Sequence, residues 1–144
     1  MSVIALRTGR SPASGREQPI ETSVDDAARR IFVKINGQAT GRHVSTGVCS
    51  IFLTRPDAVT YDMLYDLRDY AGDVTAEDVM PIVAVYAECK PDTSVPCRTA
   101  FVTSDPNFDF WAAAMNEQFP GRTHKSFKVL EHAEAWLKQP LAER

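Results

Sequence analysis

Apolar and polar positions alternate with two different periods along the chain, and these periods predict strands and helices in turn. Residues 20–24 and 30–36 are short extended runs on either side of the stretch Asp-Asp-Ala-Ala at 25–28. The second run alternates apolar with polar positions through Ile31, Val33 and Ile35. The pair therefore predicts a β-hairpin.

The first helix is expected to follow this hairpin. Gly37 breaks the strand, and Thr40 is a suitable N-cap because its side-chain oxygen accepts a hydrogen bond from an unpaired backbone N–H. Gly47 weakens the helix by about 1 kcal/mol relative to alanine, and Arg-Pro-Asp at 55–57 ends it. The apolar positions with helical spacing are Val44, Val48, Ile51 and Phe52.

A buried strand is predicted over 61–67, and a second helix after Gly72. Thr75 and Asp78 have the spacing of a capping box. Pro81 lies beyond the first turn and removes a backbone hydrogen bond, so a bend or a short 3₁₀ start is expected there. A strand over 82–87 is the alternative. The helical stripe would consist of Val79, Ile82, Val83 and Tyr86.

The strand and helix predicted over residues 98–119 have the clearest pattern in the chain. A strand is predicted over 98–103, followed by Asp105 as a cap and Pro106 at the first helical position. The inward stripe of this helix would be Phe108, Trp111, Ala112, Met115 and Phe119. Pro120-Gly121 ends it.

A final strand over 126–130 and a helix over 133–139 complete the pattern. The order ββαβαβαβα predicts an α/β fold with four helices. Its sheet would have five strands and be mainly parallel, with an antiparallel first strand at or near an edge.

Composition fits a single globular domain. The chain has 144 residues, of which 44% are hydrophobic and 24% charged, and this length supports a core without disulfides or structural metal. Residues 1–19 mix Gly, Pro, Ser and Arg without periodicity. We therefore expect a flexible basic leader over 1–19, one domain over 20–139 and a tail over 140–144.

The net charge of −3 argues against nucleic acid as a partner, because phosphate binding depends on clustered Lys and Arg. Neither a signal peptide nor a membrane-spanning run is visible, so a cytoplasmic protein is expected. Seven acidic residues between positions 57 and 78 predict a solvated acidic edge, with a divalent-cation site as the alternative.

Residues that commonly carry chemistry form no motif. Cys49, Cys89 and Cys97 lack the spacing of a zinc or redox site and are expected to be reduced. Cys49 is expected in the core, whereas Cys97, beside a loop and Arg98, is the better candidate for a reactive thiol.

The three histidines, His43, His124 and His132, are far apart in the sequence and are expected to be solvated, His124 in a loop. We therefore predict no catalytic residue, no metal and no cofactor.

Five segments in this order resemble the SpoIIAA-like group of the STAS superfamily (sulfate transporter and anti-sigma antagonist) over about residues 20–137. They are Val-Lys-Ile-Asn-Gly at 33–37 leading to Thr40, Met-Leu-Tyr-Asp-Leu-Arg at 63–68, Val-Thr-Ala-Glu-Asp at 74–78, Arg-Thr-Ala-Phe-Val at 98–102, and an ending over 127–137 with Glu-Ala-Trp-Leu at 134–137. The resemblance implies a SpoIIAA-like fold.

Sporulation-type members are regulators in which a serine within an Asp-Ser-Ser-Gly stretch is phosphorylated. The matching segment is Asp73-Val74-Thr75-Ala76, which lacks that serine and the glycine. Thr75 is the remaining hydroxyl; its role as an N-cap explains it, and phosphorylation is the alternative. Some proteins of this kind are likened to Sec14-type lipid-binding domains.

In an open parallel sheet, ligands bind beyond the carboxyl ends of the strands, where helix N-termini gather. A ligand or phosphorylation site is therefore predicted at that edge, with capping and turn formation as the purely structural alternative. The candidate residues are Asn36, Gly37, Thr40, Asp69, Tyr70, Thr75, Ser104, Asp105 and Asn107.

The leading hypothesis is a non-enzymatic STAS-like regulatory or protein-interaction module that binds another protein or a second copy of itself. It predicts no sizeable apolar cavity and an exposed patch around the second or third helix. The alternative is a small-ligand or lipid-binding domain with a pocket between the sheet and its helices. An enzyme ranks third.

Overall fold

The computed structural model describes residues 18–72 and 74–140. The predicted leader over 1–19 and the tail over 140–144 therefore fall almost wholly outside the described part of the chain.

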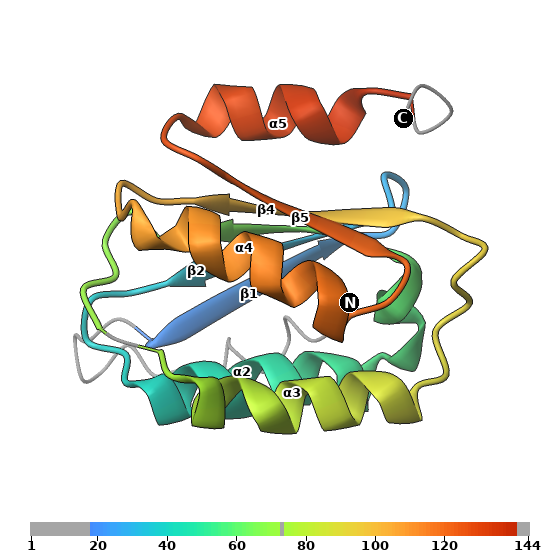
Figure 1. Ribbon diagram of the computed structural model, residues 1–144, viewed down its shortest axis with the longest axis horizontal. Coiled ribbons are helices and arrows are strands. Elements are labelled where there is room, and N and C mark those ends of the chain that lie inside the picture. The colour runs from blue at the N-terminus through green and yellow to red at the C-terminus, as the bar shows by residue number, and fades with distance from the viewer. Residues whose placement is uncertain (1–17, 73, 141–144) are drawn as a thin grey trace.

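Five strands form one sheet in the order β1-β2-β3-β4-β5 (Figure 1). β1 pairs with β2 in antiparallel fashion and lies at the edge, whereas the other three pairs are parallel. The predicted hairpin and the mainly parallel sheet are confirmed. The strands are β1 Ile20–Asp25, β2 Arg30–Ile35, β3 Asp62–Asp66, β4 Cys97–Val102 and β5 Arg122–Phe127.

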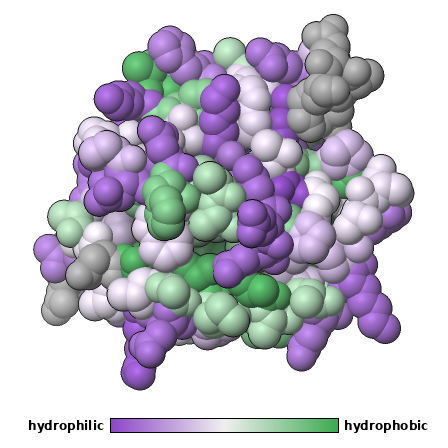
Figure 2. Space-filling model, in the orientation of Figure 1, coloured by the Kyte–Doolittle hydropathy of each residue, from purple (hydrophilic) through white to green (hydrophobic). Residues whose placement is uncertain are grey.

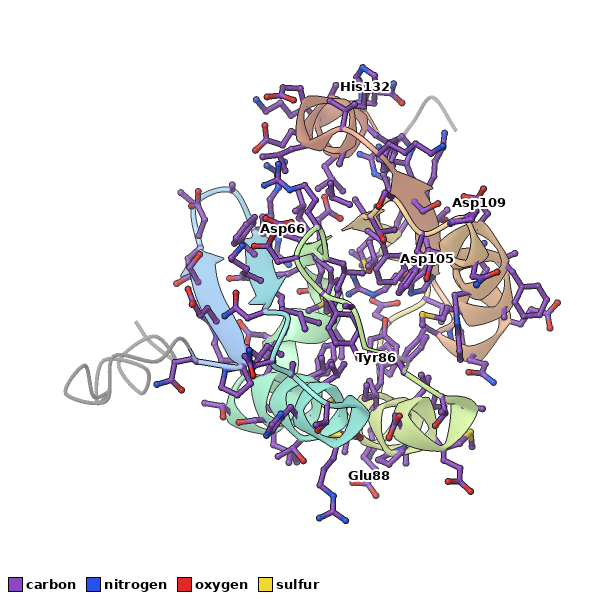
Figure 3. The ribbon with its side chains drawn as sticks, turned by 90° about the vertical axis from the view of Figure 1, so that its left-hand side faces the viewer. Asp66, Tyr86, Glu88, Asp105, Asp109 and His132 are labelled. Atoms are coloured by element: carbon purple, nitrogen blue, oxygen red, sulfur yellow. The ribbon has the colours of Figure 1, made fainter. Side chains whose placement is uncertain are left out.

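The four α-helices among the described residues cover the sheet unequally. Helices α2, α3 and α4 lie on one face and α5 lies alone on the other (Figures 1 and 3). A short 3₁₀ helix, η2, which the sequence pattern did not predict, follows α2 directly. The bounds are α2 Gly41–Thr54, η2 Pro56–Thr60, α3 Ala76–Glu88, α4 Asn107–Gln118 and α5 Leu130–Lys138.

The core has two layers, one on each face of the sheet. The larger layer lies under α2, α3 and α4, and the apolar stripe predicted for α2 is buried in it. In the smaller layer, Ala133 and Leu137 of α5 pack over Leu64, Ala100 and Val102. Because both of its faces are covered, β4 is buried along its whole length.

The capping box of α3 forms as predicted. The backbone N–H of Asp78 donates to Thr75 Oγ1 at 3.4 Å, and the N–H of Thr75 donates to Asp78 Oδ2 at 2.9 Å. The 3₁₀ start expected at Pro81 and the alternative strand over 82–87 are both wrong, because α3 is α-helical from Ala76 to Glu88. Pro81 lies on the exposed side, where water can satisfy the carbonyl that loses its partner.

The last strand begins earlier than predicted. β5 starts at Arg122 rather than at 126, and α5 starts at Leu130, so Val129 is the residue before a helix and not part of a strand. The inward positions of β5 are Arg122 and His124, which alternate with exposed Thr123 and Lys125. A search for apolar alternation misses this strand because its buried residues are polar.

Candidate functional site

The loops after β2 and β3 meet at the carboxyl edge of the sheet. A Cβ atom on Gly37 would lie 2.8 Å from the carbonyl oxygen of Asp69, so this approach requires glycine. Asn36 is buried, and its Nδ2 donates to the carbonyl of Gln18 and, at 3.3 Å, to Glu21 Oε2. Asn36 therefore ties this loop to the segment around β1.

Helices α2 and α3 begin side by side at the same edge, since a Cβ atom on Gly41 would lie 2.1 Å from Asp78 Oδ2. Thr40 Oγ1 accepts a hydrogen bond from the backbone N–H of His43 at 3.1 Å, and His43 Nδ1 accepts one from the N–H of Thr40 at 3.0 Å. Thr40 and Thr75 thus both cap helices, and Thr75 is exposed.

Charged side chains surround the ends of β2 and β3. Lys34 Nζ donates to Asp69 Oδ2 at 3.0 Å. Arg68 binds the buried carboxylate of Asp66 through Nε and Nη2, each at 2.9 Å. The Arg68 guanidinium holds the pKa of Asp66 below its ordinary value. These pairs stabilise the turn after β3.

Ser104, Asp105 and Asn107 form a separate exposed group at the start of α4. Asp105 Oδ1 accepts a hydrogen bond from the N–H of Asn107 at 2.9 Å, and Thr103 Oγ1 accepts one from the N–H of Asp105 at 3.1 Å. The helix begins at Asn107, one residue later than predicted. The hydrogen bonds among the described residues do not join this group to Thr40 or Thr75, and a binding role for the nine candidates stays a prediction.

An apolar pocket lies between the sheet, α3 and α4. Half-buried Phe108, Trp111 and Met115 of α4 form one wall, and Val79 and Ile82 of α3 form the opposite wall. Figure 2 shows its mouth as a hollow with a hydrophobic floor between these two helices. Among the nine predicted site residues, Tyr70 alone lines this pocket.

The cavity is small, about 80 Å³, and it opens to solvent. A cavity of about 150 Å³ lined by apolar side chains can hold benzene. The cavity is smaller than that, so it would hold a narrow group such as a short alkyl chain, and the rest of a ligand would extend toward the opening. Met115 at the rim is flexible enough to adapt to different shapes.

A buried cation lies at the floor of this pocket. Arg122 of β5 has five N–H bonds, and five acceptors lie within 3.4 Å of its nitrogens. All five are uncharged. They are Tyr86 Oη, Thr99 Oγ1 and the carbonyl oxygens of Ala58, Val59 and Arg98.

His124 is the second polar residue of the floor, and its predicted place in a solvated loop is wrong. It lies in β5, it is 7% exposed, and its ring stacks on Phe101 with centroids 6.0 Å apart. Burial, together with the charge of Arg122, lowers the pKa of His124 to about 3. The imidazole is therefore neutral at physiological pH.

Two tyrosine side chains also line the pocket. Tyr65 is buried, and Tyr86 Oη accepts a hydrogen bond from Arg122 Nε at 3.4 Å. Burial raises the pKa of both side chains, so both remain protonated. The pocket therefore offers few polar groups, each fixed in one protonation state.

The thiols of Cys97 and Cys49 lie in or beside the core. Cys97 is buried at the start of β4, and its Sγ lies 3.4 Å from the carbonyl oxygen of Val59. Burial raises the pKa of this thiol, so its selection as the reactive candidate is wrong. Cys49 is half-buried and packs against the core, and burial raises the pKa of its thiol too.

Within residues 18–72 and 74–140, no three His, Cys, Asp or Glu side chains are grouped so that they could hold a metal ion. None of the helices in this part of the chain is long and apolar enough to cross a membrane.

The strand order, the antiparallel first strand and the four helices define a SpoIIAA-like α/β fold, as the resemblance in sequence implied. A similar solved structure is that of an uncharacterised protein of the DUF3478 family with a SpoIIAA-like fold from Shewanella loihica PV-4. The TM-score is 0.56 at 14% sequence identity, and the match covers 85% of this chain and 96% of the other. No protein-family model matches the chain, and a search of curated proteins found no match.

Proposed function

We propose that this chain is a non-enzymatic binding module, and that its ligand is a small, mainly apolar molecule held between the sheet, α3 and α4. The observation that supports this proposal most strongly is the pocket itself. Its walls come from separate elements, and Phe108, Trp111 and Met115 remain only half-buried beside it. A concave apolar site with a few fixed polar groups is the usual form of a small-molecule site.

The packing of the helices explains why the space exists. Helix α2 packs along α3, and α4 packs along β5. Helices α3 and α4 therefore pack mainly against other elements and not against each other. The aromatic side chains between the two helices do not fill the space completely. Tyr86 contacts Phe52 and Phe119 edge-to-face at centroid distances of 5.4 and 5.1 Å, and these contacts fix the inner end of the gap.

Fluorescence of Trp111 tests the proposal directly. Trp111 lines the pocket, whereas Trp136 packs against Phe127 on the opposite face of the sheet. In a Trp136→Phe variant, Trp111 is the remaining tryptophan. Titration with 1-hexanol is expected to change its emission in a saturable way. In the matched Trp111→Phe variant, the emission of Trp136 is expected to stay constant, and the absence of a saturable change at Trp111 would count against the pocket as a binding site.

Binding to another protein is the second candidate function. Large apolar side chains are exposed on the outer sides of the helices that flank the pocket, Met80 on α3 and Phe110 on α4. Such exposure is common at protein–protein contacts. If this chain associates with itself through these residues, Phe110→Glu should convert a concentration-dependent dimer to a monomer in sedimentation experiments; a wild-type chain that is monomeric at every concentration would contradict self-association.

A further inference from the structure

His124 is held in one tautomer by Asn116. The backbone N–H of His124 donates to Asn116 Oδ1 at 2.6 Å, so this amide atom must be oxygen and not nitrogen. The ring atom Nδ1 of His124 lies 3.1 Å from the same oxygen. Two acceptors cannot bond to each other, so Nδ1 carries the proton of the neutral ring. The other ring nitrogen, Nε2, therefore has a lone pair and acts only as an acceptor.

The imidazole forms part of the pocket wall. Its ring lies between Phe101 and Phe119, at centroid distances of 6.0 and 5.5 Å, and all three side chains line the pocket. Arg122 precedes it by two residues on the same face of β5. Because five acceptors within the protein already face the guanidinium, Arg122 has no N–H left for a ligand.

We infer that Nε2 of His124 accepts a hydrogen bond from the ligand, so that the pocket selects a small apolar molecule carrying one uncharged donor, such as an alcohol or a phenol. This inference rests on the proposed function. A carboxylate brings only acceptors to the lone pair of Nε2. A hydrocarbon or an ether brings no donor and leaves the acceptor unpaired in an apolar site, which is unfavourable.

Two isomeric probes test this selectivity. 1-Hexanol and methyl pentyl ether have the same formula, and the alcohol alone has a donor. In NMR titrations of the full chain, 1-hexanol is expected to bind with a dissociation constant about three- to tenfold lower than that of the ether. In His124→Phe, which keeps an aromatic ring, both probes should bind equally. Equal binding to the wild type, or tighter binding of hexanoate than of 1-hexanol, would overturn the inference.

Histidine ¹⁵N spectra of the wild-type chain provide a test without substitution. At pH 7, Nε2 of His124 should give the signal of an unprotonated nitrogen, and this signal should move when 1-hexanol is added and stay in place when the ether is added. A protonated Nε2 in the free protein would refute the inference. If both probes bind equally, the proposed function stands and the inference fails; if neither binds, both fail.

Discussion

At the scale of single residues, the pocket contains two buried polar side chains without a charged partner: the hydrogen-bond partners of Arg122 are all uncharged, and His124 is itself neutral. Arg122 and His124 occupy the inward positions of β5, which in the other parallel strands are mainly apolar. The sequence pattern could not reveal them, because the stretch Arg-Thr-His-Lys-Ser has the polarity of a loop.

The neutral state of His124 makes stability depend on pH. Its pKa is about 3 in the folded chain and 6.5 in a solvated histidine, so between these values the unfolded chain binds a proton that the folded chain does not. The free energy of unfolding should therefore fall as pH decreases through this window, by about 2 kcal/mol between pH 7 and pH 5. Urea denaturation at both pH values measures it.

In His124→Phe this part of the pH dependence should disappear. The carboxyl groups of Asp26 and Asp66 have pKa values below 3.8, so they affect stability mainly below pH 5 and do not obscure the comparison. An identical loss between pH 7 and pH 5 in wild type and variant would show that His124 is not buried as a neutral ring.

Burial should also control the reactivity of the thiols. Cys97 is 3% exposed and the pKa of its thiol is raised, so little thiolate forms at pH 7. We expect a disulfide reagent to leave Cys97 unmodified in the folded chain. In about 6 M urea, which unfolds the chain and exposes the thiol, the reagent should modify it rapidly. Peptide mass spectrometry locates the modified cysteine, and rapid labelling of Cys97 in the folded chain would contradict its position at the start of β4.

At the scale of elements, the predictions succeeded where apolar spacing and helix caps agreed. α2 and α3 were both predicted from a threonine cap followed by apolar residues at helical spacing, and both are present. The 3₁₀ start expected at Pro81 was wrong. Proline removes one backbone hydrogen bond within the helix, and this loss costs less where the carbonyl without a partner faces water. The 3₁₀ helix η2 carries no periodic pattern, so its presence could not be predicted.

The cap of α3 gives a prediction at this scale. Thr75→Ala removes the side-chain acceptor for the N–H of Asp78 and should lower the free energy of unfolding by about 1 kcal/mol. Thr75→Ser keeps the hydroxyl and should change it by only a few tenths. Chemical denaturation measures both variants; an equal loss for serine and alanine would show that the hydroxyl does not stabilise the helix start.

At the scale of the whole molecule, the fold class followed from the order of elements, whereas the sequence left two positions open for a site, the carboxyl edge of the sheet and a space between the sheet and its helices. The rule for open parallel sheets predicted polar residues at the carboxyl edge, and there Thr40, Asp69 and Thr75 mainly cap helices or pair with charges. The pocket instead opens between two helices on one face of the sheet. It arises from the distance between α3 and α4, and a one-dimensional pattern of apolar residues contains no information on such distances.

Filling the pocket from α4 tests the central claim most directly. Met115→Trp places a larger side chain in the pocket, whereas Phe110→Trp makes a comparable change on the exposed side of the same helix. The dissociation constant of 1-hexanol, measured by NMR titration, should rise at least about tenfold in Met115→Trp, which corresponds to about 1.4 kcal/mol, and remain unchanged in Phe110→Trp. Equal affinity in the wild type and in a folded Met115→Trp chain would contradict binding between α3 and α4.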